Sequence, residues 1–308
     1  MNGLRTLQGE LLSRGYGGRL LLEEPLSRHT SFAIGGPADL FIAVREPEEC
    51  VELVQLARAV QVPALLLGGG TNILVADAGV RGLVIANECR QVTLREDGWV
   101  VARSGTVLHH LARWSLTQGL SGLEWAVGIP GTVGGATVGN AGAYGGCLAE
   151  VLRWATVLTP TGSVEQVSVA ALGLSYRDSA LKRAPRAQRQ VLLEVALQLV
   201  PGEAQELMRK AEELMAQRKA RTPEGCCAGS IFKRTAQHPA GYLVEQAGLK
   251  GRRIGGAEVS PVHANFIMNS GGATAADVRA LVETVQREVW AAYAEHLEIE
   301  IEYVGAWS

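Results

Sequence analysis

The chain has 308 residues and a net charge of −2, with 47% hydrophobic and 19% charged residues. This composition is ordinary for a folded globular protein, and without a basic excess it gives no reason to expect nucleic acid as a partner. No apolar run is long enough to cross a membrane, so we expect no membrane association and a cytoplasmic location. The length exceeds what one core usually serves, which predicts two or three domains.

The first part of the chain predicts a small α/β unit. Residues 1–24 have leucines at helical spacing, and residues 40–44 form an apolar strand. Pro47 opens a helix that runs to about Val60 and has Cys50, Leu53, Val54 and Ala57 on one face. Short strands are expected at 64–67, 73–75 and 83–85.

The middle of the chain is predicted to be mainly β-structure, and the last third mixed. A helix at 107–118 interrupts expected strands at 91–94, 99–102, 151–158, 164–167 and 191–199. Helices are then predicted at 203–220 and 275–296. The final strand is expected at 298–304, where alternation puts Glu298, Glu300 and Glu302 on one face.

Two glycine-rich segments are the main functional signal. One covers residues 121–145, and the other, Gly68 to Asn72, directly follows the strand at 64–67. Glycines let the backbone approach a ligand and offer N–H groups to a phosphate, although tight turns between strands would also explain them. Neither segment is a Walker A loop or a Rossmann fingerprint. Two such loops suit a dinucleotide, whose pyrophosphate needs donors from more than one side.

Several polar residues have both a structural and a functional interpretation. Arg177 could form a surface ion pair or grip a carboxylate. Ser230 could be a turn serine or, with polarising neighbours, a proton donor. The three glutamates near the C-terminus could be solvated, or one could act in a cleft. The pair His109 and His110 suits a helix surface better than a metal site, and the scattered cysteines form no CxxC pair, so we expect no metal.

In sequence order, several segments together resemble the UDP-N-acetylenolpyruvoylglucosamine reductase (MurB) family, over about residues 25–305. The similarity includes both glycine loops and the runs Tyr-Arg-Asp-Ser at 176–179 and Gly-Ser-Ile-Phe-Lys at 229–233. Further similar segments are 30–32, 34–39, 140–145, 247–251 and 263–269. The absence of an insertion after Lys233 resembles the shorter subtype, which lacks an extra substrate loop.

The resemblance implies an α+β chain with an FAD-binding fold of the vanillyl-alcohol-oxidase (PCMH) type and a C-terminal α/β substrate domain. It divides the chain into an N-terminal FAD-binding subdomain at 1–87, joined by the last strand at 298–308, a second FAD-binding subdomain at 88–200, and a substrate-binding domain at 201–297. It implies no particular oligomer.

The resemblance also implies a reaction in peptidoglycan synthesis: NADPH-dependent reduction of the enolpyruvyl ether on UDP-N-acetylglucosamine to UDP-N-acetylmuramate. Non-covalent FAD would pass hydride from N5 to C3 of the enolpyruvyl group. Related oxidases often attach their flavin through a histidine in the first glycine loop, where this chain has Gly70, Thr71 and Asn72.

Site residues follow from the same resemblance. Arg177 matches the residue that neutralises the developing negative charge, Ser230 the donor of a proton to C2, and Glu300 the active-site carboxylate. Weaker candidates for substrate contact are Tyr176, Lys233 and His263. The residues expected to hold FAD are Gly68, Gly69, Gly70, Thr71, Asn72, Gly128, Ile129, Pro130, Gly131, Thr132, Gly134, Gly135, Asn140 and Gly142.

Some positions depart from the family pattern. Thr132 stands where serine is common but keeps the hydroxyl, and Ile299-Glu300-Ile301-Glu302 replaces a Pro-Glu-Val-Arg run. Glu298 is therefore the alternative to Glu300. Two other functions stay open from the sequence: a different FAD oxidoreductase of this fold that acts on an alcohol or hydroxy acid, and a flavin- or nucleotide-binding protein without catalysis.

Overall fold

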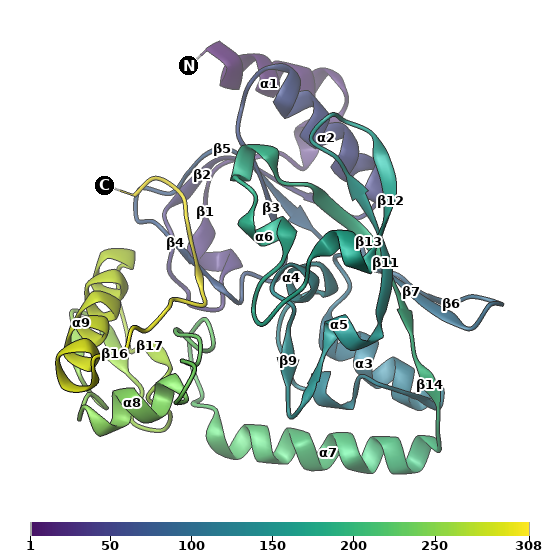
Figure 1. Ribbon diagram of the computed structural model, residues 1–308. Helices are drawn as coiled ribbons and strands as arrows, with labels where there is room; N and C mark the ends of the chain where they lie inside the picture. Colours follow the sequence, from purple (N-terminus) through teal and green to yellow (C-terminus); the bar gives the residue numbers. More distant parts are fainter. Residues whose placement is uncertain (1, 308) are drawn as a thin grey trace. The chain divides into compact units, whose positions relative to one another are not determined.

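Two compact units make up the protein, of which the computed structural model describes residues 2–307 (Figure 1). Unit 1 contains the residues up to Leu20, Phe41–Gly69 and Gly82–Arg218. Unit 2 contains Leu21–Leu40, Gly70–Arg81 and the residues from Lys219 onward. Both units are therefore assembled from segments far apart in the sequence. The division into three domains at 87 and 200 stays a prediction.

A five-stranded antiparallel sheet is the centre of unit 1. One register row runs across it through Val167, Ala155, Val195, Ala102 and Val92. Residues paired across a sheet face the same side of it. The three central residues of this row, Ala155, Val195 and Ala102, are fully buried, so this side of the sheet faces the core. In spatial order the strands are β12 (Val164–Ser168), β11 (Leu152–Leu158), β13 (Val191–Gln198), β7 (Trp99–Arg103) and β6 (Val92–Leu94).

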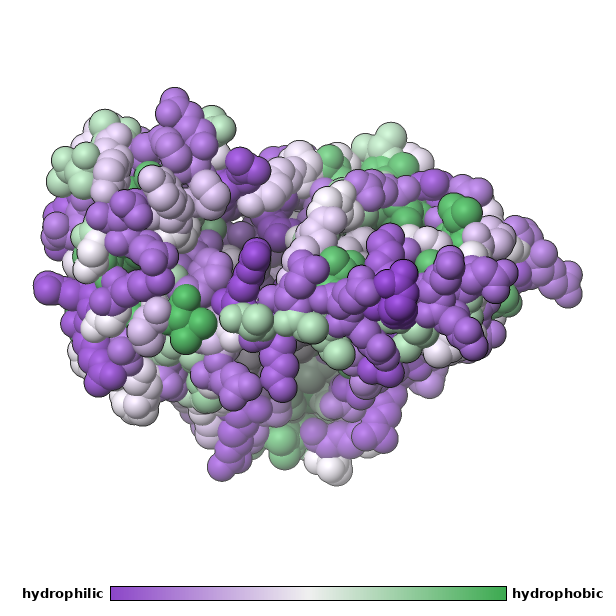
Figure 2. Space-filling model, turned by 90° about the horizontal axis from the view of Figure 1, so that it is seen from below, coloured by the Kyte–Doolittle hydropathy of each residue, from purple (hydrophilic) through white to green (hydrophobic). Residues whose placement is uncertain are grey.

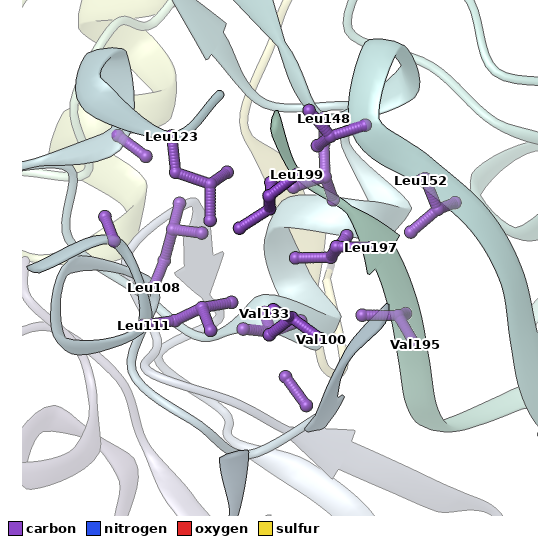
Figure 3. Packing of buried hydrophobic residues seen from close by; sticks show 14 of the residues in the cluster. Val100, Leu108, Leu111, Leu123, Val133, Leu148, Leu152, Val195, Leu197 and Leu199 are labelled. Atoms are coloured by element: carbon purple, nitrogen blue, oxygen red, sulfur yellow. The ribbon is translucent and has the colours of Figure 1, made fainter. Parts of the chain in front are cut away.

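Two helices complete the core of unit 1. Figure 3 shows Leu108 and Leu111 of α3 (Leu108–Thr117) and Val133 of α4 (Val133–Val138) packed with Val195 and Leu197 of β13. The helix α4 lies inside the glycine-rich stretch, where no helix was expected. It begins because the Thr132 hydroxyl accepts the Gly135 N–H and caps the first turn.

The remaining elements of unit 1 agree in part with the sequence patterns: the helix and strand segments near 47–67 match, whereas the helix expected over residues 1–24 is shorter and several short elements were not predicted. Helix α2 (Pro47–Ala59) has Pro at its first position and buries Cys50, Leu53, Val54 and Ala57, the face that its spacing predicted. Helix α1 covers only Asn2–Ser13 of the region with leucines at helical spacing. The others are β3 (Ala64–Leu67), which pairs in parallel with β5 (Val80–Asn87), and β8 (Leu120–Ser121), β9 (Gly142–Ala143), β10 (Gly146–Cys147), α5 (Leu148–Val151), α6 (Ala180–Arg183), β14 (Val200–Pro201) and α7 (Ala204–Arg221). The short strands β9 and β10 pair with each other, as do β8 and β14.

Unit 2 packs a long helix, α9 (Ala275–Tyr293), on a small antiparallel sheet. A capping box of Thr274 and Asp277 starts this helix, and Val278, Leu281, Val282, Val285 and Val289 form its buried stripe. The sheet has the strand order β15 (Arg253–Ile254), β16 (Ala257–Val259), β17 (Ile267–Asn269). The other elements are β1 (Leu21–Pro25), β4 (Ile73–Val75), α8 (Ala240–Gln246) and β18 (Glu302–Val304), while β2 (Pro37–Val44) begins in unit 2 and ends in unit 1.

The predicted C-terminal strand is wrong in its extent. Only Glu302–Val304 form a regular strand, which pairs in parallel with β4. Residues 298–301 instead meet the irregular segment around Phe232, through an isolated bridge between Ile299 and Phe232.

The surface shown in Figure 2 is mainly hydrophilic with scattered hydrophobic residues, as is normal for a folded protein.

Candidate active site

The first glycine loop, residues 68–72, and the second glycine loop, residues 128–132 of the longer glycine-rich stretch, meet within unit 1 through Gly68 and Thr132. A Cβ atom added to Gly68 would lie 2.6 Å from Oγ1 of Thr132, well inside ordinary contact distance. Gly68 follows β3, and Thr132 ends the second loop just before α4. The absence of a side chain at residue 68 therefore lets the two loops approach each other.

The second loop exposes backbone donors beside this contact. Gly128 and Gly131 have φ values of +84° and +107°, a region that favours glycine. Among residues 2–307, the N–H groups of Gly131 and Thr132 have no hydrogen-bond acceptor. Because backbone N–H groups bind anions, the junction of Gly68 with Thr132 fits the pyrophosphate of FAD. A Cβ at residue 68 would occupy the space between the two loops, so this arrangement of donors requires glycine there.

Other glycines of the stretch serve close packing. The N–H of Gly134 donates to the carbonyl oxygen of Ser104 at 2.8 Å, and a Cβ on Gly134 would lie 3.0 Å from that residue. A Cβ on Gly142 would lie 2.6 Å from the carbonyl oxygen of Gly146. Both glycines therefore let neighbouring backbone segments approach, which is a structural reason for their presence.

Arg177 occupies the tip of a tight turn in unit 1. Ser175 and Asp178 exchange two backbone hydrogen bonds, of 3.0 and 3.2 Å, with Tyr176 and Arg177 between them. Arg177 has φ +55°, which is uncommon for a residue with a side chain and occurs often at functional sites. Its Nη2 donates to the carbonyl oxygen of Gly142 at 2.7 Å, so the direction of the guanidinium is fixed.

The glycine-rich stretch also holds this turn through Asn140. Its buried side chain donates from Nδ2 to the carbonyl oxygen of Ser175 at 2.9 Å and accepts the N–H of Ala149 at Oδ1. The Ser179 hydroxyl donates to the carbonyl oxygen of Val138 at 2.7 Å. The amide of Asn140, expected at the cofactor, thus contacts the segment that carries Arg177, and the hydroxyphenyl group of Tyr176 is exposed beside it.

Ser230 and Lys233 lie in an extended segment of unit 2 that Asn265 holds. The Asn265 side chain accepts the Phe232 N–H at 3.0 Å and donates to the Phe232 carbonyl oxygen at 2.9 Å. The Asn265 carbonyl oxygen accepts the Ile231 N–H at 2.8 Å. This buried residue acts as a strand partner for a segment that has no regular strand beside it.

Asn265 was not predicted as a functional residue. The available signal was an amide in an apolar run, Ala264-Asn265-Phe266-Ile267, where a polar residue needs partners once it is buried. The same run carries His263, whose Nδ1 accepts the Asn265 N–H at 3.2 Å. Burial lowers the pKa of His263 below its ordinary value, which favours the neutral ring that this bond requires.

The structure separates the two candidate glutamates. The Glu300 N–H donates to the carbonyl oxygen of Ile231 at 2.8 Å, and Asn72 Nδ2 donates to the Glu300 carbonyl oxygen at 3.3 Å. Glu300 is therefore attached both to the segment of Ser230 and to the first glycine loop. The Glu298 carbonyl oxygen also accepts a hydrogen bond from this segment, from the Lys233 N–H at 2.8 Å, but the Glu298 carboxylate pairs with Lys233 Nζ at 2.6 Å and 72% of its side chain is exposed.

Gly70 and Thr71 complete the first loop in unit 2. Gly70 has φ +61°, and a Cβ there would lie 2.1 Å from the carbonyl oxygen of His29. Unit 1 thus gathers Gly68, Gly69, the second loop and Arg177, and unit 2 gathers Asn72, Ser230, Lys233, His263 and Glu300. In residues 2–307, no group of three or more His, Cys, Asp or Glu side chains could hold a metal ion, and no helix is long and apolar enough to span a membrane.

Comparison with known proteins gives two family matches. Residues 38–168 match the FAD binding domain, and residues 221–304 match the C-terminal domain of UDP-N-acetylenolpyruvoylglucosamine reductase. The Moorella thermoacetica reductase of that name is 43% identical over 304 residues, with 98% of each chain covered. The Heliobacterium modesticaldum reductase is 39% identical, covering 96% of this chain and 93% of that protein.

A solved structure has the same fold over nearly the whole chain. The crystal structure of UDP-N-acetylenolpyruvylglucosamine reductase (MurB) from Thermus caldophilus superposes with a TM-score of 0.78 at 36% identity. The match covers 92% of this chain and 98% of that one. The α+β architecture with an FAD-binding fold, expected from the sequence, is therefore confirmed.

Proposed function

The chain belongs to the UDP-N-acetylenolpyruvoylglucosamine reductase family, and on this premise we propose how its residues carry out the family's reaction. The protein reduces the enolpyruvyl ether of UDP-N-acetylglucosamine-enolpyruvate to UDP-N-acetylmuramate, a step of peptidoglycan synthesis. FAD is its cofactor, and NADPH is the reductant. The substrate takes up a hydride at C3 and a proton at C2, while NADPH becomes NADP⁺. We further propose a cytoplasmic location, which suits the use of NADPH.

The glycine loops hold the cofactor. Gly68, Gly69, Gly131 and Thr132 bind the pyrophosphate of FAD through backbone N–H groups, since their loops meet without a side chain between them. Gly70, Thr71, Asn72 and residues 128–130 extend this surface along the cofactor. When bound, the flavin supplies the hydride. No histidine of the first loop is available to attach it, so binding is non-covalent.

Arg177, Ser230 and Glu300 act on the substrate. As C3 is reduced, negative charge develops toward the substrate carboxylate, and the Arg177 guanidinium stabilises it. Glu300 holds the enolate-like form of the substrate that hydride transfer to C3 leaves, and the Ser230 hydroxyl then donates the proton to its C2. Tyr176, Lys233 and His263 contact the substrate around these three groups. A fixed guanidinium suits this role because its hydrogen bond to Gly142 leaves little reorganisation for the reaction.

One observation carries the assignment of the carboxylate. The hydrogen bond from the Glu300 N–H to the Ile231 carbonyl oxygen places Glu300 next to the residue that follows Ser230. A proton donor and a carboxylate held on adjacent segments can act on neighbouring atoms of one substrate. The exposed ion pair between Glu298 and Lys233 supports Glu300 over Glu298 for this role.

The test follows the flavin and the product together. Purified protein is loaded with FAD and mixed anaerobically with NADPH, after which the enolpyruvyl substrate is added. We expect the visible flavin band to bleach with NADPH and return with substrate, with UDP-N-acetylmuramate formed in equal amount. Slow reduction by NADPH with rapid reduction by a simple alcohol or hydroxy acid would instead favour a different oxidoreductase of this fold.

A further inference from the structure

His109 holds the first residue of the second glycine loop. Its Nδ1 accepts the Gly128 N–H at 2.9 Å. Gly128 has φ +84°, so the chain turns sharply there. The orientation of its peptide group therefore sets the direction of residues 129–132. His109 is half-buried, whereas the neighbouring His110 is exposed and lies beside it, with 5.7 Å between the ring centroids.

The start of α3 binds the same loop at a second place. Val107 and Thr132 form an isolated bridge, in which the Leu108 N–H donates to the Gly131 carbonyl oxygen at 3.0 Å and the Val133 N–H to the Thr106 carbonyl oxygen at 2.8 Å. Residues 128–132 are thus fixed at both ends by the first turn of α3. Between these two attachments, Pro130 has no N–H, and the Gly131 N–H has no hydrogen-bond acceptor among the described residues.

The geometry defines the chemical state of the imidazole. A backbone N–H can only donate, so Nδ1 of His109 is unprotonated and the ring proton is on Nε2. Burial, followed by the charges of His110 and Arg113, lowers the pKa of His109 and favours this neutral form. A metal ion at Nδ1 would have to displace the Gly128 N–H, which argues against the two histidines as a metal site.

We propose that His109 is a positioning residue for the cofactor: by accepting the Gly128 N–H it holds the second loop so that the Gly131 and Thr132 N–H groups point at the FAD pyrophosphate. The identity of the ligand rests on the proposed function. The alternative, a surface histidine pair, explains His110 but not the bond between His109 and the loop. His109 contacts neither substrate nor the reacting atoms in this proposal, so it affects how tightly FAD binds rather than the chemistry.

The experiment compares three variants in FAD binding by the apoprotein, followed by flavin fluorescence. His109→Leu removes the acceptor, His109→Asn places an amide oxygen close to the position of Nδ1, and His110→Leu is the matched control. Loss of one hydrogen bond that leaves a backbone donor unsatisfied predicts about tenfold weaker FAD binding for His109→Leu. His109→Asn should bind FAD nearly as tightly as the unchanged protein, and His110→Leu should be indistinguishable from it.

The outcomes separate this proposal from the proposed function. Equal FAD affinity of His109→Leu and His110→Leu would overturn the role of His109, and so would a failure of His109→Asn to recover binding. If the unchanged protein does not bind FAD, the proposed function itself fails. A loss of turnover in His109→Leu at saturating FAD that exceeds its loss of FAD affinity would contradict a role limited to the loop. Urea unfolding of each apoprotein shows whether His109→Leu is folded, and if it is not, His109→Asn alone decides.

Discussion

The contact between Gly68 and Thr132 gives the sharpest steric test of the cofactor site. In Gly68→Ala the new methyl group would lie 2.6 Å from the Thr132 hydroxyl oxygen, whereas ordinary contacts begin at 3.4 Å. The backbone at residue 68 does not have a positive φ, so alanine is allowed there and the effect is purely one of space. The loops must therefore separate by several tenths of an ångström, or Thr132 must rotate.

Both ways of relieving the clash weaken the site. Thr132 is buried, and its hydroxyl caps α4 by accepting the Gly135 N–H at 3.3 Å, so rotation removes a helix cap worth about 1 kcal/mol. Separation of the loops moves the N–H donors away from the pyrophosphate, and overpacking of this kind costs about 1–3 kcal/mol. We expect about tenfold to hundredfold weaker FAD binding.

The assay is equilibrium titration of the apoprotein with FAD, and the chain supplies both a control and a rescue. The resemblance placed Gly135 at the cofactor, but its N–H donates to the Thr132 hydroxyl and it is not among the proposed pyrophosphate donors; a Cβ there would lie 3.7 Å from the same Thr132 oxygen, so Gly135→Ala should bind FAD normally. In the double variant Gly68→Ala/Thr132→Ala the clashing oxygen is gone, and binding should recover beyond the product of the single effects. If Gly68→Ala binds FAD as tightly as Gly135→Ala, the two loops do not close on the cofactor and the reasoning is wrong.

The remaining predictions concern unit 2. Asn265→Leu removes both side-chain bonds to Phe232 and should slow flavin reoxidation by substrate about tenfold to hundredfold, while stopped-flow reduction by NADPH stays unchanged; equal slowing of both steps would contradict a local effect. Glu300→Gln should abolish most turnover and Glu298→Gln should not, and the reverse result in steady-state assays would transfer the carboxylate role to Glu298. Because burial lowers the pKa of His263 in the folded state, the unfolded chain takes up the proton first as pH falls below about 6.5. The contribution of His263 to stability is therefore intact above that pH and declines below it, so urea unfolding of His263→Asn should show a weaker acid dependence than the unchanged protein, and identical pH profiles would refute this.

Local patterns were sufficient where a residue's role depends on its own element. The buried face of α2 could be predicted because four apolar residues recur at helical spacing behind Pro47. The strands β7, β11 and β13 could also be predicted locally, because their apolar runs are bounded by turns. The resemblance of ordered motifs then supplied the family and the fold, which the comparisons confirm.

Long-range partners explain what could not be predicted. Helix α4 contains two glycines and was missed, because its start depends on the Thr132 cap and on a hydrogen bond from Gly134 to Ser104. Residues 298–301 alternate like a strand but meet only an irregular segment, so regular pairing begins at Glu302, where β4 is the partner. Alternation describes one strand, whereas strand formation depends on a neighbour that the sequence does not identify.

Long-range contacts also explain why the roles of three side chains at the site could not be predicted from the sequence. Asn265 and His109 each bind the backbone of a distant loop; Asn265 lies in a segment that resembles the family, but neither residue was given a role from the sequence. Asn140 was assigned to the cofactor by resemblance, and in the structure its amide holds the turn of Arg177. These contacts depend on which loops come together in the fold, so they become visible only in three dimensions.

The most direct test of the account is the effect of Ser230→Ala on the two half-reactions measured separately in the FAD-loaded protein. A positioned proton donor is typically worth about 10²–10⁴-fold in rate. We expect nearly normal flavin reduction by NADPH, and flavin reoxidation by the enolpyruvyl substrate slowed by that factor. Equal loss in both half-reactions, or normal reoxidation, would contradict the role of Ser230 as the proton donor.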